Sequence, residues 1–389
     1  MIGDAVRFTG EEFIKMNILL VGNYGFDVQQ SMGHFALMLR DGLTKAGHHV
    51  KLICPQPFFG RLKPSGHGIG KWLGYIDKFL IFPCMLRREL PWADVVHICD
   101  HSNALYVKHV KKVPHIITCH DMIAIRDARG EFPGHVMRWT GKILQRMIFG
   151  AMRSAGMVAC VSQTTRMDVL RLSGLGQEKV RVIHNGLNYP YSHMDGEEAR
   201  GRLAALGIDT GRPYILHVGG NQWYKNRAGV IEIFKYLVHS GGSEDIRLVM
   251  VGQPFTEEMS RRISEYGMEG KVQGVISPGN EDLRALYSGA AALVFPSLQE
   301  GFGWPIIEAQ ACGCVVFATN RAPMTEVGGD SAVYITPEDP AGAAGVLREY
   351  LGDPARLDDM RKRGYENIRN FSAEKMIAGY CDIYREIRA

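Results

Sequence analysis

Two glutamates enclose a glycine-containing turn in the stretch Glu300-Gly-Phe-Gly-Trp-Pro-Ile-Ile-Glu308, which follows the apolar run AALVFPS. Gly301 and Gly303 allow the backbone to approach a ligand closely. Pro305 is typical of the first position of a helix, and the free amides and positive dipole end of a helix suit a diphosphate. Glu308 would then accept hydrogen bonds from a diol such as a ribose, and Glu300 would lie on the sugar side of the phosphates. The alternative for Glu308 is a carboxylate that merely complements the helix dipole.

Two cations, Lys225 and Arg227, follow a second apolar run, PYILHVGG, where a helix should begin. Cationic side chains at a helix N-terminus oppose the dipole of the helix, so their presence there calls for an anion. They could neutralise the charge of a diphosphate leaving group. The alternative is a solvated basic face, which is common at a helix start. We expect Gly219, Gly220 and Asn221, which lie at the end of the run, to line the same anion site.

A histidine, His120, follows the apolar run HIITC and is itself followed by Asp121. A histidine just beyond the end of a buried strand faces the edge of the sheet where ligands bind. The alternative is a histidine whose hydrogen bonds are satisfied within the structure. We favour that alternative for His97, His101 and His184.

The sequence favours charge neutralisation without a metal. It has no D-x-D pair, the usual carboxylate motif for a metal-bound nucleotide sugar, and its scattered aspartates do not make a magnesium site. The one tight cysteine pair, Cys312-Gly-Cys314, has no second CxxC or HxxxH nearby. Because Lys225, Arg227 and helix amides could supply the positive charge, we expect neither a metal nor a cofactor.

Strands must position these residues. Apolar runs that are continuous rather than alternating are typical of strands buried on both faces of a parallel sheet. Such runs lie at 17–22, 49–54, 94–99, 115–119, 157–162, 180–185, 213–220, 246–252, 271–276, 291–297, 314–320 and 332–335. Helical stretches fill the gaps, as in FALMLRDGLTKAG, which ends on Gly47 as a C-cap should. In open α/β sheets ligands bind beyond the carboxyl ends of strands, which is where His120, Lys225 and Glu300 fall.

Length and element order indicate two domains. The chain has 389 residues, and single cores stop growing near roughly 250–300 residues. Because the strand–helix pattern starts again at PYILHVGG, we expect an α/β fold with two Rossmann-like domains, over 1–195 and 205–371, whose parallel sheets face a central cleft. The last helix, about 372–389, has no strand after it and could pack on either domain.

The composition excludes several classes. Apolar residues make up 46% and the net charge is +4, which is ordinary for a globular protein and too weakly basic to argue for nucleic acid. The eight cysteines are scattered, several within apolar runs, so we expect reduced thiols and a cytoplasmic protein. No apolar run is long enough to span a bilayer, the N-terminus lacks the apolar core of a signal peptide, and we assign residues 1–15 no function.

The stretch EGFGWPIIEAQACG resembles the E-x7-E signature of retaining glycosyltransferase family 4, a family with the GT-B fold. TNRAPMTEVGGDSAVYITPED and HVGGNQWYKNR resemble other parts of the same family, as do GHHVKLI, TCHD and ACVSQTTRMDVLR in the first half. The resemblance covers about 17–385. It implies an acceptor-binding N-terminal domain, a C-terminal domain that binds a nucleotide sugar, and a hexosyltransferase that retains the anomeric configuration.

The resemblance also implies roles for individual residues. The first glutamate of the family motif contacts donor-sugar hydroxyls and the second binds the ribose, which map to Glu300 and Glu308. Backbone amides around Phe302, Gly303 and Trp304 would hold the sugar and the phosphates. His120 would lie near the donor sugar and the reacting centre.

The chain departs from the family pattern at two places. The family usually has an arginine where this chain has Gly220, and we expect Arg227 to substitute for it, with Asn221 as the alternative. Family members usually carry a Gly-Gly pair near the acceptor, which falls here at Gln30-Ser31. We therefore expect Ser31, Met32 and Gly33 on the acceptor side.

Two segments could contact a membrane. Residues 70–90 mix basic and large apolar side chains, and Arg138, Lys142 and Arg146 recur every four residues in GHVMRWTGKILQRMIFGAMR. A basic amphipathic helix can lie on anionic lipid. The alternative is a helix packed on the core with a solvated face. A peripheral contact with the inner face of the membrane is thus one interpretation of these segments.

The resemblance implies a hexosyltransferase that uses a nucleotide-diphosphate sugar, with UDP- and GDP-linked hexoses both open as donors. By the same resemblance the acceptor would be a growing glycan or a lipid-linked oligosaccharide in surface polysaccharide or glycoconjugate synthesis. The base pocket should lie near Gln253 and the loop after KVQGVI. The alternatives are a GT-B epimerase, a sugar phosphorylase, and a sensor that binds nucleotide sugars without turnover.

Overall fold

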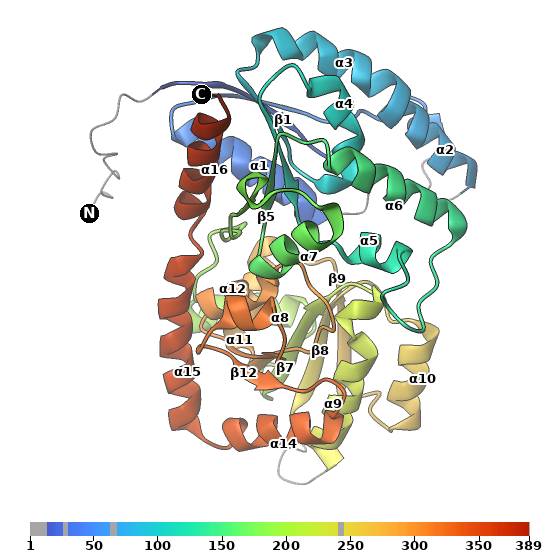
Figure 1. Ribbon diagram of the computed structural model, residues 1–389. Coiled ribbons are helices and arrows are strands. Elements are labelled where there is room, and N and C mark those ends of the chain that lie inside the picture. The colour runs from blue at the N-terminus through green and yellow to red at the C-terminus, as the bar shows by residue number, and fades with distance from the viewer. Residues whose placement is uncertain (1–13, 26–29, 63–67, 240–244, 389) are drawn as a thin grey trace. The chain divides into compact units, whose positions relative to one another are not determined.

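The computed structural model describes residues 14–25, 30–62, 68–239 and 245–388 (Figure 1). In this part of the chain, the strands form two six-stranded parallel sheets with helices between successive strands. Each of the twelve runs that the sequence analysis identified contains one of these strands, so the predicted α/β class with two parallel sheets is confirmed.

The first sheet has the order β2-β1-β3-β4-β5-β6. Its strands are β1 (Asn17–Val21), β2 (His49–Ile53), β3 (Val95–Ile98), β4 (His115–Cys119), β5 (Met157–Cys160) and β6 (Val180–Val182). The helices between them are α1 (Gln30–Lys45), α2 (Gly68–Ile76), α3 (Phe82–Glu89), α4 (Val107–Val110), α5 (Ile123–Ala128), α6 (Trp139–Met152) and α7 (Gln163–Ser173). A π-helical turn (Asp77–Ile81) joins α2 to α3. Strands β3, β4 and β5 are buried along their whole length, as expected for the interior of a parallel sheet.

The second sheet has the order β12-β11-β10-β7-β8-β9. Its strands are β7 (Tyr214–Gly219), β8 (Arg247–Gly252), β9 (Val272–Ile276), β10 (Ala292–Phe295), β11 (Val315–Thr319) and β12 (Val333–Ile335). Its helices are α8 (Gly196–Ala205), α9 (Arg227–His239), α10 (Glu257–Glu265), α11 (Asn280–Gly289), α12 (Trp304–Ala311), α13 (Met324–Gly328), α14 (Pro340–Leu351), α15 (Pro354–Asn367) and α16 (Ala373–Arg388). The 3-10 turn η6 (Trp223–Lys225) precedes α9.

Alternate side chains of the second sheet enter two separate apolar cores, because successive residues of a strand point to opposite faces. Leu216, Leu293 and Val316 pack with residues of α8, α11 and α12, and the neighbouring residues Ile215 and Val294 pack with residues of α9, α10 and α14. These helices lie on the two faces of the sheet (Figure 1). Burial on both faces explains why the strands read as continuous apolar runs.

The chain divides into two compact units. The first comprises residues 1–118, 147–158 and 379–389, and the second comprises residues 119–146 and 159–378. In this division residues 119–146 and 159–195 belong to the second unit, and the domain bounds 1–195 and 205–371 stay a prediction. The end of α16 groups with the first unit, where the Tyr384 hydroxyl lies 2.6 Å from Nδ1 of His97.

Candidate active site

Loops at the carboxyl edge of the second sheet are joined by hydrogen bonds. The turn η6 follows β7, and the loop before α12 follows β10. The backbone N–H of Leu298 donates to the carbonyl of Tyr224 (2.7 Å), and the Asn226 side chain donates to the carbonyl of Pro296 (3.1 Å). Lys225 and Glu300 are thus carried by two neighbouring segments, and Arg227 and Glu308 lie on the helices that follow them, at the edge of the sheet where open α/β sheets bind ligands.

Lys225 and Glu300 form an ion pair. The Lys225 ammonium donates to both carboxylate oxygens of Glu300, at 2.8 and 2.9 Å. The Glu300 side chain is only 7% exposed, so this pair is shielded from solvent more than a surface pair would be. The ammonium also lies over the ring of Phe295, 5.7 Å from its centroid. The structure therefore brings together Lys225 and Glu300, which were expected at the donor diphosphate and the donor sugar and which we predict to be catalytic together with His120.

Arg227, at the first position of α9, is buried with unused donors. One of its terminal nitrogens donates to the side chain of Asn221 and to the carbonyl of Gln253 (2.9 Å). Its Nε and the other terminal nitrogen have no hydrogen-bond partner among the described residues, although the residue is only 4% exposed. Burial lowers the pKa of this guanidinium from its ordinary value. A buried cation with unused donors has the chemistry needed to bind an anion.

A buried histidine, His217, lies against Gly219 at the end of β7. It was not among the candidate site residues predicted from the sequence. His217 lies in β7, is fully buried and has a pKa lowered to about 3, chiefly by burial, so its ring is neutral. A Cβ on Gly219 would lie 2.9 Å from Nε2 of this ring. A Cβ on Gly252 would lie 2.1 Å from the carbonyl oxygen of Gly219. Glycine is therefore required at positions 219 and 252, where β7 and β8 end side by side. The exposed Asn221 follows shortly after the end of β7.

The turn before α12 is built around a glycine with a positive φ. Gly303 has a φ of +103° and precedes the helix, which begins at Trp304, so Pro305 occupies the second helical position instead of the first. The Phe302 ring packs against Phe371, with 5.7 Å between centroids, and the Trp304 indole donates to the carbonyl of Gly186 (2.9 Å). Since these aromatic side chains are held by the protein, what the turn can offer a ligand is its backbone amides.

Glu308 is a buried carboxyl on the fifth residue of α12, with hydrogen bonds to side chains. Its oxygens accept from the Asn188 amide (3.1 Å) and the Tyr287 hydroxyl (2.9 Å). Burial raises the pKa of Glu308 to about 7, and the two hydrogen bonds and Lys225 oppose that rise. Two specific side chains therefore bind the Glu308 carboxyl. The alternative that Glu308 merely complements the helix dipole does not explain these contacts.

His120 lies beside the glycine turn of the second unit. The residue is 6% exposed and follows β4 directly. A Cβ on Gly301 would come within 1.8 Å of the His120 carbonyl oxygen and 2.9 Å of the Asp121 Cβ. The structure therefore brings the His120 backbone next to Gly301, and the role of its side chain near the reacting centre stays a prediction.

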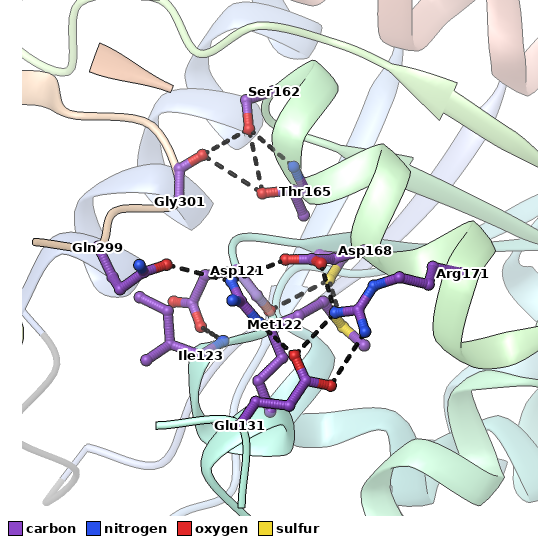
Figure 2. A network of polar contacts seen from close by, with 12 residues as sticks. Asp121, Met122, Ile123, Glu131, Ser162, Thr165, Asp168, Arg171, Gln299 and Gly301 are labelled. Atoms are coloured by element: carbon purple, nitrogen blue, oxygen red, sulfur yellow. Dashed lines mark hydrogen bonds and ion pairs between the residues drawn. The ribbon is translucent and has the colours of Figure 1, made fainter. Parts of the chain in front are cut away.

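The hydroxyls of α7 hold the same turn. Ser162 caps α7 by accepting from the backbone of Thr165, and its hydroxyl donates to the carbonyl of Gly301 (2.7 Å), which Thr165 also contacts (3.3 Å). Figure 2 shows both hydroxyls directed at that carbonyl. Ser162 and Thr165 were not among the site residues predicted from the sequence. The signal that could have pointed to Ser162 is a serine followed by a helical pattern, which is typical of an N-cap.

The three residues expected on the acceptor side lie in the first unit, in the first turn of α1. Ser31 and Gly33 are exposed and Met32 is partly buried. Residues 26–29 of the preceding turn lie outside the described residues. The assignment of Ser31, Met32 and Gly33 to an acceptor stays a prediction.

Within residues 14–25, 30–62, 68–239 and 245–388 there is no group of three or more His, Cys, Asp or Glu side chains able to hold a metal ion. None of the helices in these ranges is long and apolar enough to cross a membrane.

Two family models match consecutive parts of the chain. Residues 32–189 match the family described as Glycosyltransferase Family 4, and residues 202–367 match the family described as Glycosyl transferases group 1. Among curated proteins, the chain is 23% identical to O-antigen chain mannosyltransferase B of Escherichia coli, over 83% of this chain and 84% of the relative. It is 27% identical to alpha-maltose-1-phosphate synthase of Mycolicibacterium smegmatis, over 71% and 74% of the two chains.

Solved structures share the fold over nearly the whole chain. Anabaena HepE in complex with UDP and glucose superposes with a TM-score of 0.72 at 16% identity, covering 95% of this chain and 100% of that one. Sucrose-phosphate synthase from Thermosynechococcus elongatus superposes with a TM-score of 0.73 at 19% identity, covering 96% and 99%. At these identities the likeness concerns the fold.

Proposed function

This chain is a glycosyltransferase of family 4 with the GT-B fold, and we propose that it moves a hexose of the mannose or glucose type from a nucleotide-diphosphate sugar to a hydroxyl of a glycan or lipid-linked acceptor, with retention at the anomeric carbon. The observation that carries the donor assignment is the buried Arg227, whose two unpartnered nitrogens lie within the same set of loops as the Lys225–Glu300 pair. Such donors suit the oxygens of a diphosphate.

The proposed donor site divides the ligand among named residues. Lys225, Arg227 and the free backbone amides at the start of α12 would bind the diphosphate. The Glu308 carboxyl would accept from the ribose diol, and Glu300 would hold donor-sugar hydroxyls. Gln253, which already accepts from the backbone of Asn221 (2.9 Å), lies on the loop that would contact the base.

The proposed reaction is a direct displacement. The acceptor hydroxyl attacks the anomeric carbon on the face from which the diphosphate departs, the bond from that carbon to the phosphate oxygen breaks, and the departing phosphate accepts the hydroxyl proton. Lys225 and Arg227 stabilise the negative charge that develops on the leaving group. The Lys225 ammonium donates to both oxygens of Glu300, so a donor sugar bound by Glu300 would bring its phosphates next to this cation. We propose that these cations make a metal unnecessary.

The names of relatives guide the choice of sugar. One relative is named a mannosyltransferase of an O-antigen chain and another a synthase of alpha-maltose-1-phosphate, so we propose a role in surface polysaccharide or glycoconjugate synthesis. A cytoplasmic enzyme that receives a lipid-linked acceptor would work at a membrane surface. Two exposed apolar segments favour such a contact.

The first segment runs from α2 through the π-helical turn to α3. Trp72 and Leu80 are each 67% exposed, and the exposed Arg87 and Arg88 end the same run. The second segment begins before α6 and continues along it, where Val136, Trp139, Ile143 and Met147 recur at helical spacing and are between 47% and 84% exposed, beside the exposed Arg138 and Arg146. Apolar side chains interspersed with arginines suit the interface of an anionic bilayer.

A nucleotide-release assay tests the proposed function. Purified full-length protein with EDTA would be incubated with UDP-, GDP- and ADP-sugars, with and without membrane-lipid extract as acceptor. We expect release of one nucleotide from one sugar, stimulated by the extract. Nucleotide binding without release from any donor would favour a sensor without turnover and overturn the proposal.

A further inference from the structure

A cluster of charged side chains lies beside the Glu300 loop. Arg126, on α5, donates through Nε to Glu131 (3.0 Å) and through one terminal nitrogen to Asp168 on α7 (3.1 Å). Arg171 donates to both of the same carboxylates, at 2.8 to 3.1 Å. Two arginines therefore balance two carboxylates, and Figure 2 shows Glu131, Asp168 and Arg171 gathered in one network.

The cluster reaches the active-site loop through a single uncharged residue. The terminal nitrogen of Arg126 that binds Asp168 also donates to the side-chain oxygen of Gln299, at 3.1 Å. Gln299 immediately precedes Glu300, and Gly301 is held by the hydroxyls of Ser162 and Thr165. Three successive residues of the loop thus have separate anchors, which are Arg126 for Gln299, Lys225 for Glu300 and α7 for Gly301.

Arg126 also supports the residue that pairs with Glu300. Its guanidinium lies over the ring of Phe132, 4.8 Å from the centroid. Phe132 is buried and packs on Trp223, with 5.0 Å between ring centroids. Trp223 opens the three-residue turn that ends in Lys225. All of these residues belong to the second unit, so the contacts close a ring from Arg126 through both members of the ion pair.

We propose that Arg126 is a positioning residue for the transfer reaction, acting through Gln299 on the carboxylate of Glu300 and through Phe132 and Trp223 on the ammonium of Lys225. This inference rests on the proposed function of that pair. The side chains of Arg126, Glu131 and Asp168 are only 16–25% exposed, so the network is shielded enough to hold a fixed geometry. A mobile surface arginine would not fix the loop in this way.

The kinetic test uses Arg126→Met, Gln299→Met and the double variant, with the donor that the wild-type protein turns over in the nucleotide-release assay. Because a displacement of a catalytic group by about 1 Å can cost about 100-fold in rate, each single variant should lose roughly 10- to 100-fold in kcat, with KM for the donor changed by less than about threefold. The double variant should be no slower than the slower single variant, because Arg126→Met already removes the contact that Gln299→Met removes.

A matched control separates positioning from stability. Arg262 likewise bridges two carboxylates, Glu232 (2.8 Å) and Glu258 (2.6 Å), away from this loop. Arg262→Met should lower the melting temperature in the same way and leave kcat within about twofold. A wild-type kcat for both Arg126→Met and Gln299→Met would overturn the proposal, and so would equal losses of kcat in Arg126→Met and Arg262→Met.

Amide hydrogen exchange gives a readout that does not need turnover. Exchange in the peptide that covers residues 297–303 should rise in Arg126→Met and Gln299→Met and stay unchanged in Arg262→Met. If the wild-type protein released no nucleotide but this pattern appeared, the proposed function would fail and the positioning contact would stand. Unchanged exchange in both loop variants would overturn the positioning proposal even in an active enzyme.

Discussion

The α-carbon of Gly301 faces the carbonyl oxygen of His120 so closely that a Cβ on the glycine would lie 1.8 Å from that oxygen. The limiting atom belongs to the backbone of His120, which cannot move aside as a flexible side chain can. The Glu300–Gly303 turn therefore requires a glycine at position 301. The residue after the first glutamate and the residue after β4 are therefore fitted to each other, although they lie far apart in the sequence.

Gly301→Ala should consequently damage the site more than the addition of one methyl group suggests. We expect overpacking to cost about 1–3 kcal/mol in the free energy of unfolding and to lower kcat by roughly 10-fold or more, because Glu300 moves with its neighbour. Urea unfolding and nucleotide release measure the two effects. Gly345→Ala, at a helical glycine with open space around its α-carbon, is the matched control and should preserve both.

Arg227 should show opposite effects on stability and on binding. Because its buried guanidinium leaves two nitrogens without partners among the described residues, Arg227→Met removes a desolvated cation and should keep or raise the melting temperature. The same variant should bind UDP and GDP roughly 10-fold or more weakly by calorimetry, since charge-assisted hydrogen bonds to phosphate are lost. A clear loss of stability with unchanged nucleotide affinity would assign Arg227 a purely structural role.

Glu308 predicts a particular pH dependence of stability. Its pKa is raised from 4.5 to about 7 in the folded protein, so the folded state holds a proton that the unfolded chain releases between these values. The stabilisation is present below pH 4.5 and is lost as the pH rises to about 7, by at most about 3 kcal/mol. The free energy of unfolding should therefore fall less steeply from pH 5 to 7.5 in Glu308→Gln than in the wild-type protein. Parallel pH profiles for the two proteins would contradict the assignment.

The exposed apolar segments predict binding to anionic vesicles. Trp139 and Ile143 on α6 are 72% and 47% exposed, and insertion of such side chains at the lipid interface is favourable. Trp139→Ser/Ile143→Ser should reduce co-flotation with phosphatidylglycerol vesicles several-fold and leave nucleotide release from the donor, measured with a soluble acceptor, unchanged. Met167→Ser, an exposed apolar residue of α7, is the control. If the wild-type protein, the double variant and Met167→Ser co-floated equally, the proposed membrane contact would be wrong.

The sequence predicts the elements well because each is specified locally. Continuous apolar runs indicate strands that are buried on both faces. Glycines, which have no side chain, indicate the turns that follow these strands. The Glu300–Glu308 stretch could be found for the same reason, since its residues are neighbours in the chain. Pro305 was placed one position early because the helix is initiated by Gly303, whose φ is +103°.

The missed residues are those whose role depends on distant contacts. Arg126 lies 173 positions from Gln299, and Asn188 lies 120 positions from Glu308. Neither an arginine on a short helix nor an asparagine in a loop has a periodicity or spacing that marks it. His217 is hidden inside an apolar strand, where its neutral ring follows from burial that only the fold reveals.

The most direct test of the central claim compares nucleotide release by the wild-type protein, Glu300→Ala and Lys225→Ala, all with EDTA present. We expect the wild-type protein to release one nucleotide from one donor sugar. Each variant should lose roughly 100-fold or more in kcat. The circular dichroism and the melting transition of each variant should remain those of a folded protein. Wild-type rates in both variants would contradict the assignment of the Lys225–Glu300 pair to the transfer reaction.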